Sequence, residues 1–198
     1  MISNCNFEYS AASYESREML DFSEFDTEGS SSDMLIDCFR SFNKVTEYEM
    51  YDVKQLNDFV LFAISKNKIV ERLALDKCGE IHSHVGLQAV ITNCPNLYYL
   101  RLSRWNRINK QDLVSLFEIK NNLTQITICY HNTLDTESVI SILESTFKHR
   151  PDESQGPGGG SIKEKIQNFK VYECSNVNHN KIKQYLRDNQ DCYVVKYN

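Results

Sequence analysis

Apolar residues recur along the chain in a short pattern, L-x-x-L-x-L, in which any apolar side chain can occupy the positions marked L. Clear copies begin at Val70, Leu97 and Leu123, at steps of 27 and 26 residues. The same period extends the series to four weaker copies, which begin at Met19, Val45, Ile166 and Cys192. Only the step from Leu123 to Ile166 is out of period, by about 17 residues. A fixed period in this range indicates a chain built of repeated structural units.

Each copy predicts a short strand, and a segment with helical spacing follows it. The run LYYLRL at 97–102 alternates apolar and polar residues, as a half-buried strand does. Downstream, apolar residues recur three and four positions apart, which places them on one face of a helix. The predicted inward faces are Leu113, Leu116 and Phe117; Val139, Ile142, Leu143 and Phe147; Leu56, Phe59, Val60 and Ala63; and Met34, Leu35, Cys38 and Phe42. Asn109 and Thr136 are the expected caps of two of these helices.

A strand and a helix in every 26 residues or so predict an α/β repeat solenoid of six or seven units. In such a horseshoe a parallel β-sheet lines the concave face and the helices cover the convex face. We assign residues 45–198 to the solenoid. Residues 1–44 hold an N-terminal cap or degenerate repeat with an acidic, serine-rich segment, and whether that segment is a cap or a flexible arm stays open.

The over-long step contains the stretch RPDESQGPGGGS at 150–161. Its polar, glycine-rich composition is typical of a flexible linker. The GPGGGS part resembles an engineered linker, and a native loop is the alternative. In either case the period resumes at Ile166, so the segment interrupts the solenoid without ending it.

Composition and charge narrow the classes of partner. The net charge of −5 and the pI of about 5.6 argue against nucleic acid and anionic membranes, because both attract basic surfaces. No apolar run approaches the roughly 20 residues of a membrane span, and no signal peptide is visible at the start of the chain. The seven cysteines are irregularly spaced and odd in number. We therefore expect free thiols and a cytoplasmic or nuclear protein.

A zinc site is the first chemical hypothesis that the stretch CGEIHSHVGLQAVITNCPNL at 78–97 raises. It contains Cys78, His82, His84 and Cys94, all of which are possible zinc ligands. Structural zinc sites pair their ligands two to four residues apart, and Cys94 has no such neighbour. We therefore expect no metal. The repeat gives another reason for Cys78, which occupies the ninth position of its unit. That position holds Val53, Cys78, Trp105, His131 and Cys174.

The same stretch resembles the cysteine-containing subclass of leucine-rich repeats, which is found in F-box proteins and their relatives. The resemblance rests on Cys78, Ile81, Gly86-Leu87, Cys94-Pro95 and Leu97. It implies a leucine-rich-repeat horseshoe in which Cys78 and Cys94 are buried thiols. It also implies an adaptor or substrate-recognition component that is related to ubiquitin ligases. No F-box is visible ahead of the repeats, so this last link is one of family analogy.

Binding is favoured over catalysis as the function. Cys129 and His131 are two positions of one strand ladder, with no orienting third group, and no phosphate loop or catalytic triad emerges. We therefore expect a non-enzymatic protein-binding module without a cofactor. Residues between the apolar ladder positions point into the concave face, where tyrosine and arginine gather, and these types are enriched in binding hot spots. The candidate partner-binding residues are Arg72, Tyr99, Arg101, Arg104, Gln125, Thr127, Lys170 and Tyr172.

Two other functions remain as alternatives. The chain could be a structural subunit of a stable complex that docks through a terminal edge strand at Cys192–Tyr197, since uncovered strand edges invite pairing. It could instead bind RNA through the stretch YYLRLSRWNRINK at 98–110, which is basic and aromatic. The acidic net charge of the whole chain speaks against RNA.

Overall fold

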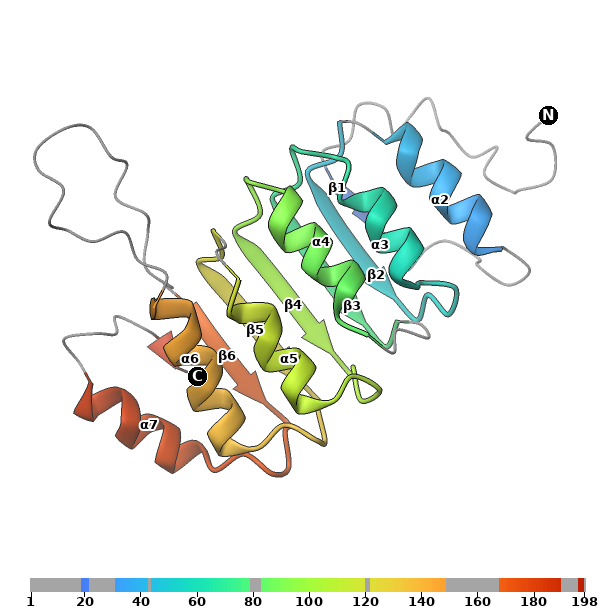
Figure 1. Ribbon diagram of the computed structural model, residues 1–198. Helices are drawn as coiled ribbons and strands as arrows, with labels where there is room; N and C mark the ends of the chain where they lie inside the picture. Colours follow the sequence, from blue (N-terminus) through green and yellow to red (C-terminus); the bar gives the residue numbers. More distant parts are fainter. Residues whose placement is uncertain are drawn as a thin grey trace, which may run out of the picture.

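The computed structural model describes residues 19–21, 31–42, 44–78, 83–119, 122–148, 168–189 and 196–197 (Figure 1). For 19–21, 147–148 and 196–197 it describes the backbone alone. The seven strands are β1 Met19–Asp21, β2 Glu47–Tyr51, β3 Arg72–Asp76, β4 Tyr99–Ser103, β5 Gln125–Cys129, β6 Asn168–Tyr172 and β7 Lys196–Tyr197. The helices between them are α2 Ser32–Ser41, α3 Asp58–Ile64, α4 Val85–Asn93, α5 Lys110–Phe117, α6 Thr136–Lys148 and α7 His179–Asp188.

The strands form one parallel sheet in which spatial order follows chain order, from β1 to β7. The helices lie on the same side of this sheet (Figure 1). Parallel neighbours need a crossover, and the described residues of each crossover contain a single helix. The described chain is therefore a solenoid-like α/β fold with alternating strands and helices, as the periodicity predicts.

The register of the sheet reproduces the repeat. Leu73 pairs with Leu100, Leu100 with Ile126, and Ile126 with Phe169. These equivalent ladder positions are all buried between the sheet and the helices. Full burial of such a side chain contributes about 1.5–3 kcal/mol. The last pair joins residues across the over-long step, so the strand at 168–172 occupies the place that the period assigns to it.

Both terminal strands differ in register from the prediction. The period places Met19 beside Val45, whereas it lies beside Glu47. At the other end, Tyr197 rather than Val195 lies beside Phe169. Both shifts equal two residues, and such a shift leaves every side chain on its predicted face. Alternation of apolar and polar residues cannot distinguish the two registers, which explains the error.

Polar residues ahead of the helices fix where they begin. Asn57, Asn109 and Asn178 each accept a hydrogen bond from the backbone N–H three residues later. The prediction that Asn109 caps a helix is thus confirmed. The prediction of Thr136 was wrong by one residue, because Asp135 accepts from the N–H of Ser138 at 2.9 Å and Thr136 is the first residue of α6. Each cap satisfies a donor that the helix itself leaves unpaired.

Two predicted helix faces need correction. Phe59 was expected to face inward with Leu56, but its side chain is 69% exposed. The reason is that Leu56 precedes the Asn57 cap, so helical spacing does not relate the two residues. In α2 the buried residues are Leu35 and Phe39, whereas Met34, Cys38 and Phe42 lie at the margins of that face.

Parts of the chain that carried predictions lie outside the described residues. These are the acidic, serine-rich stretch apart from 19–21 and 31–34, the glycine-rich segment at 150–161, and the first four residues of the predicted terminal strand, Cys192–Val195.

Candidate binding surface

The sheet has one face opposite the helices, which we call the open face. Residues that alternate with the buried ladder positions stand on it, and the parallel register aligns them in rows across neighbouring strands. Three rows cross β2 to β6: Glu47, Arg72, Tyr99, Gln125 and Asn168; Glu49, Ala74, Arg101, Thr127 and Lys170; and Tyr51, Asp76, Ser103, Cys129 and Tyr172. Seven of the eight predicted site residues are in these rows, and Arg104 follows the last residue of β4.

The first row is held by interactions between neighbouring strands. The guanidinium of Arg72 lies over the ring of Tyr99, 4.4 Å from its centroid. Its Nε is 3.4 Å from a carboxylate oxygen of Glu47. A cation over an aromatic face at a half-exposed site contributes about 0.5–1 kcal/mol. Arg72 therefore holds Tyr99 in place and has its own charge partner.

Asp76 organises the other edge of the open face. Its carboxylate accepts a hydrogen bond from Arg104 at 2.7 Å, and Arg101 approaches it at 3.9 Å. The guanidinium of Arg104 also lies 4.7 Å from the ring centroid of Tyr130. Tyr130 in turn packs edge-to-face on Tyr172, with ring centroids 6.1 Å apart. The result is a continuous band of charged and aromatic groups from β3 to β6.

A left-handed residue after each inner strand sets up this band. Positive φ angles of 53–58° occur at Asp52, Lys77, Arg104, Tyr130 and Glu173, each directly after a strand. The N–H of Arg104 donates to the carbonyl of Cys129 at 3.0 Å, and the other units repeat the bond as far as Tyr130. These bonds offset the cost of the left-handed conformation, which is about 1–2 kcal/mol for a residue with a side chain.

Sequence reasoning missed Tyr130 as a member of the surface, and it left Asp76 out of the candidate partner-binding residues. Tyr130 occupies the eighth position of its unit, directly after the strand, and strand alternation says nothing about where such a residue points. Asp76 sits in a predicted open-face row, yet its role as the shared partner of two arginines depends on the neighbouring strand. The recurrence of a polar or aromatic residue at the eighth position was the signal that could have been followed.

Three small side chains of the open face are buried, and one of them, Thr127, was predicted to bind the partner. Thr127 is only 8% exposed, and Ser103 and Cys129 are fully buried. Thr127 lies in register between Arg101 and Lys170, which carry much longer side chains. The structure therefore removes Thr127 from the residues that a partner can touch directly.

Tyr172 and Cys129 form a buried contact under the band. A hydrogen bond with the Cys129 side chain, together with burial, raises the pKa of Tyr172 to about 12. The phenol consequently stays protonated and available as a donor or acceptor at neutral pH. Among the described residues, Nε of Arg101, Oγ of Ser103 and Oδ1 of Asn168 are buried without a hydrogen-bond partner. Such atoms are rare in folded proteins and mark places where a further polar group would fit.

The ninth positions point inward and are buried in all five inner units, as the repeat predicts. The thiol of Cys78 lies 3.3 Å from the carbonyl oxygens of Met50 and Asp76, and burial raises its pKa to about 12. Cys94 lies at the other end of its unit, 3.4 Å from the carbonyl of Asn67. In the described part of the chain, no group of three or more His, Cys, Asp or Glu could hold a metal ion. His82 lies outside the described residues.

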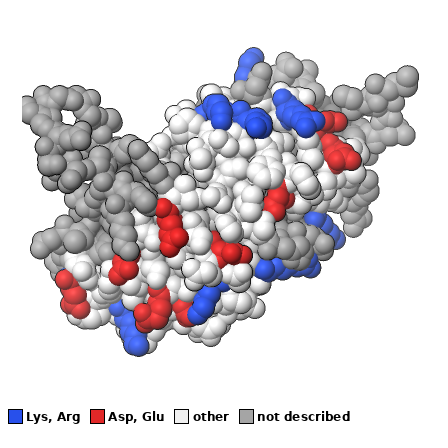
Figure 2. Space-filling model, viewed as in Figure 1, with Lys and Arg blue, Asp and Glu red and all other residues white. Residues whose placement is uncertain are grey.

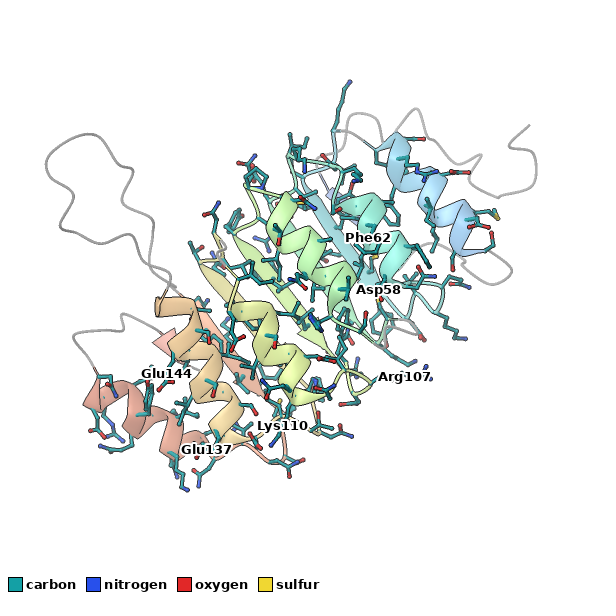
Figure 3. All side chains as sticks on the ribbon, viewed as in Figure 1. Asp58, Phe62, Arg107, Lys110, Glu137 and Glu144 are labelled. Carbon is teal, nitrogen blue, oxygen red and sulfur yellow. The ribbon has the colours of Figure 1, made fainter. Side chains whose placement is uncertain are left out.

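The basic stretch at 98–110 does not form one surface. Trp105 is buried, and the ammonium of Lys110 lies 2.6 Å from Asp135 on the helix side, at the start of α5 (Figure 3). Arg101 and Arg104, in contrast, engage Asp76 on the open face. Trp105 and Lys110 are thus separated from the part of the stretch, Tyr99, Arg101 and Arg104, that lies on the open face.

Charges on the helix side are accounted for by the helix ends. Acidic residues occupy the first turns of α2, α3, α5 and α6, where a carboxylate stabilises the positive end of the helix dipole. Lys68 donates to the carbonyl of Asn93, the last residue of α4. Figure 2 shows acidic side chains gathered in the half that holds α5 to α7, with several basic ones along the upper edge, where the helices end. On the open face the paired charges instead join neighbouring strands, as Arg72 with Glu47 and Arg104 with Asp76 show.

None of the helices in the described ranges combines the length and the apolar character that crossing a membrane requires. A scan against protein-family models finds no match, and a search of the curated proteins likewise finds no significant match to the chain.

Proposed function

We propose that this protein is a non-catalytic interaction module of the leucine-rich-repeat type, and that it binds a partner protein through the open face of its sheet. In this proposal the sheet is the concave lining of a short horseshoe. The step of 26 or 27 residues and the in-register ladder of Leu73, Leu100 and Ile126 support the repeat assignment. The cysteine subclass suggested by Cys78 and Cys94 adds an adaptor or substrate-recognition role, related to ubiquitin ligases, as the context of binding.

One observation carries the proposal: the band of Arg104, Tyr130 and Tyr172 beside Asp76 is ordered, aromatic and charged, and none of the described helices covers it. Tyrosine and arginine dominate the energetics of protein interfaces because they combine large contact area with hydrogen bonding. Their positions are fixed by neighbouring strands, so the free protein has already lost much of the side-chain entropy that binding would otherwise cost.

Site-specific photo-crosslinking tests which face is used. A benzophenone amino acid at Tyr51, which is 50% exposed at the edge of the open face, is compared with one at Phe59 on α3, which is 69% exposed on the helix side. In native extract, crosslinks to a defined protein are expected from position 51 and not from position 59. The reverse pattern would show that the helix side is the docking surface.

A second candidate is a structural subunit that docks by extension of the sheet. The observation in its favour is that β7 is the last strand in the sheet order, paired on one side with β6. The same crosslinker at Lys196 tests it. Crosslinks from position 196 alone would favour sheet extension over binding by the open face.

A further inference from the structure

The middle row of the open face carries charges that the described residues neutralise only in part. The row runs Glu49, Ala74, Arg101, Thr127, Lys170 across β2 to β6. Among the described residues, no opposite charge lies within ion-pair distance of Glu49 or Lys170, and Arg101 reaches Asp76 only at 3.9 Å. The Nε of Arg101 has no hydrogen-bond partner in the described part of the chain.

The charges of the first row, and those at the positions around the strand ends, differ in this respect. Arg72 is paired with Glu47, Arg104 with Asp76, and Lys77 with Asp52 at 2.6 Å. Most charged groups at the open face are therefore paired with an opposite charge of an adjacent unit and do not simply point into solvent. The middle row leaves a negative group at one end and two positive groups at the other.

The spacing of these groups follows from sheet geometry. Neighbouring strands lie about 4.8 Å apart, so Arg101 and Lys170, two strands apart, are separated by about 10 Å at their backbones. Thr127 between them has a short, buried side chain, so a group of the partner would sit between the two longer basic side chains and not on Thr127 itself. Glu49 lies three strands from that midpoint, or about 14 Å away, and Ala74 and Arg101 lie on the strands between. An extended chain covers this distance in about four residues.

We propose that the binding partner presents a segment of mixed charge to this row: an aspartate or glutamate between Arg101 and Lys170, and a lysine or arginine about four residues away at Glu49. The inference rests on the proposed function and names the chemistry of the partner. Tyr99 and Tyr172 stand on either side of the acidic subsite, in the neighbouring rows, and partial exclusion of water by these rings strengthens the attraction. Asp76 near Arg101 lowers the local positive potential, which suits a singly charged carboxylate better than a phosphate.

Selection of peptides from a random dodecamer phage library on the immobilised full chain tests the proposal. Parallel selections use the variant Arg101→Glu/Lys170→Glu and the charge-matched control Lys181→Glu/Lys183→Glu, whose substitutions lie on exposed positions of α7. The wild-type chain and the control are expected to enrich peptides with Asp or Glu about four residues from Lys or Arg. The Arg101→Glu/Lys170→Glu variant should bind these peptides about tenfold more weakly, in line with two partly exposed ion pairs, and should select basic residues at the formerly acidic position.

Two further variants separate failure of this inference from failure of the proposed function. Ala74→Trp and Tyr99→Ala, checked for folding by thermal melting, should both weaken peptides that lie on the open face. Peptides that lose binding in these variants but show no acidic enrichment, or keep it on the Arg101→Glu/Lys170→Glu chain, would overturn the charge assignment and leave open-face binding intact. If no selected peptide responds to Ala74→Trp or Tyr99→Ala, or none is recovered at all, both proposals fail.

Discussion

Gly86, in the first turn of α4, lies directly against the backbone of Asp58 in α3. Its N–H donates to Oδ1 of Asp58 at 2.9 Å, and a Cβ atom built at Gly86 would lie 2.7 Å from the Cα of Asp58. Asp58 also accepts from the hydroxyl of Ser83 at 2.5 Å, so one carboxylate of α3 holds the start of the next helix (Figure 3). Adjacent units are thus joined by a backbone contact that only glycine permits.

Replacing Gly86 with alanine should therefore lower the free energy of unfolding by about 1–3 kcal/mol, the usual cost of forcing an extra methyl group into a filled space. Urea titration followed by circular dichroism measures this. Val85→Ala is the matched control, because Val85 is the neighbouring residue and is 48% exposed. Equal effects of the two substitutions would mean that α3 and α4 can separate without cost.

Asn67 ties the end of one crossover to the preceding unit. Its buried amide nitrogen donates to the carbonyls of Phe42 and Val45, at 3.1 and 2.7 Å, and to the hydroxyl of Tyr48. Asn67→Leu leaves these acceptors without that donor, and we expect a loss of about 2–4 kcal/mol. The exposed Asn96, whose amide only reaches the carbonyl of Lys68 at 3.5 Å, serves as the control. Asn96→Leu should change the urea midpoint little.

Stability should fall as pH rises above about 9. Burial raises the pKa of Cys78 to about 12 and that of Cys94 to about 11. In the unfolded chain both thiols ionise near pH 9, so between pH 9 and 11 the unfolded state loses protons that the folded state keeps. Each thiol then weakens folding by about 1.4 kcal/mol per pH unit.

Urea titrations at pH 8 and pH 10 test this alkaline loss. The double variant Cys78→Ala/Cys94→Ala should lose less stability between the two pH values than the wild-type protein does, even though it starts from a lower value. Identical losses in the two proteins would show that the thiols are accessible to water and ionise in the folded state.

One of the residues with a left-handed backbone offers a substitution that should not lower the stability of the protein. Glu173 has a φ of 54° and an exposed side chain. Glycine adopts this conformation without strain, so Glu173→Gly should leave stability unchanged or raise it by up to about 1 kcal/mol. Glu49→Gly, at an exposed strand position with ordinary geometry, should lower it by about 0.5–1 kcal/mol. The prediction holds if the Glu173→Gly protein is more stable to thermal unfolding than the Glu49→Gly protein, and it is wrong if the order is reversed.

The open-face proposal makes its own prediction for β4. Tyr99→Ala and Arg101→Ala should each weaken partner binding by about 1–3 kcal/mol while the protein stays folded. Leu100, between them, is buried in the ladder, and Leu100→Ala should instead cost about 2–5 kcal/mol of stability. Thermal melts and a binding titration with the crosslinked partner distinguish the two effects. Normal binding by folded Tyr99→Ala and Arg101→Ala proteins would exclude the centre of the open face.

Much of the architecture follows from period alone. The ladder residues Leu73, Leu100 and Ile126 indicate together where the strands lie, which face is buried and how the strands are aligned. A slip of one residue would expose all three side chains. The terminal strands lack such clear ladders, and there the register was predicted two residues away from the observed one. For Phe59 the error was local: a cap at Asn57 starts the helix later than apolar spacing suggests.

The candidate surface was only partly predictable for a different reason. Which side chains stand on the open face depends on alternation within a strand, and sequence displays this directly. Whether they are accessible depends on neighbours that are distant in the sequence, as the burial of Thr127, which lies between Arg101 and Lys170 in the sheet, illustrates. The packing of Arg104 on Tyr130 has the same origin, because two residues with left-handed backbones meet across adjacent units.

The strands follow one another in the sheet in the same order as in the sequence. This order determines how far a local disturbance of the fold can spread. In the described part of the chain, every extensive contact between strands or between helices joins elements of neighbouring units. Such a molecule behaves as a one-dimensional array, in which the free energy of each unit depends on the two beside it. A disturbance at α7 should therefore fade within a unit or two, and hydrogen exchange should slow progressively from either end toward β4. The residues best insulated from fraying are then those of β3 to β5, the stretch in which Asp76, Arg101 and Arg104 converge.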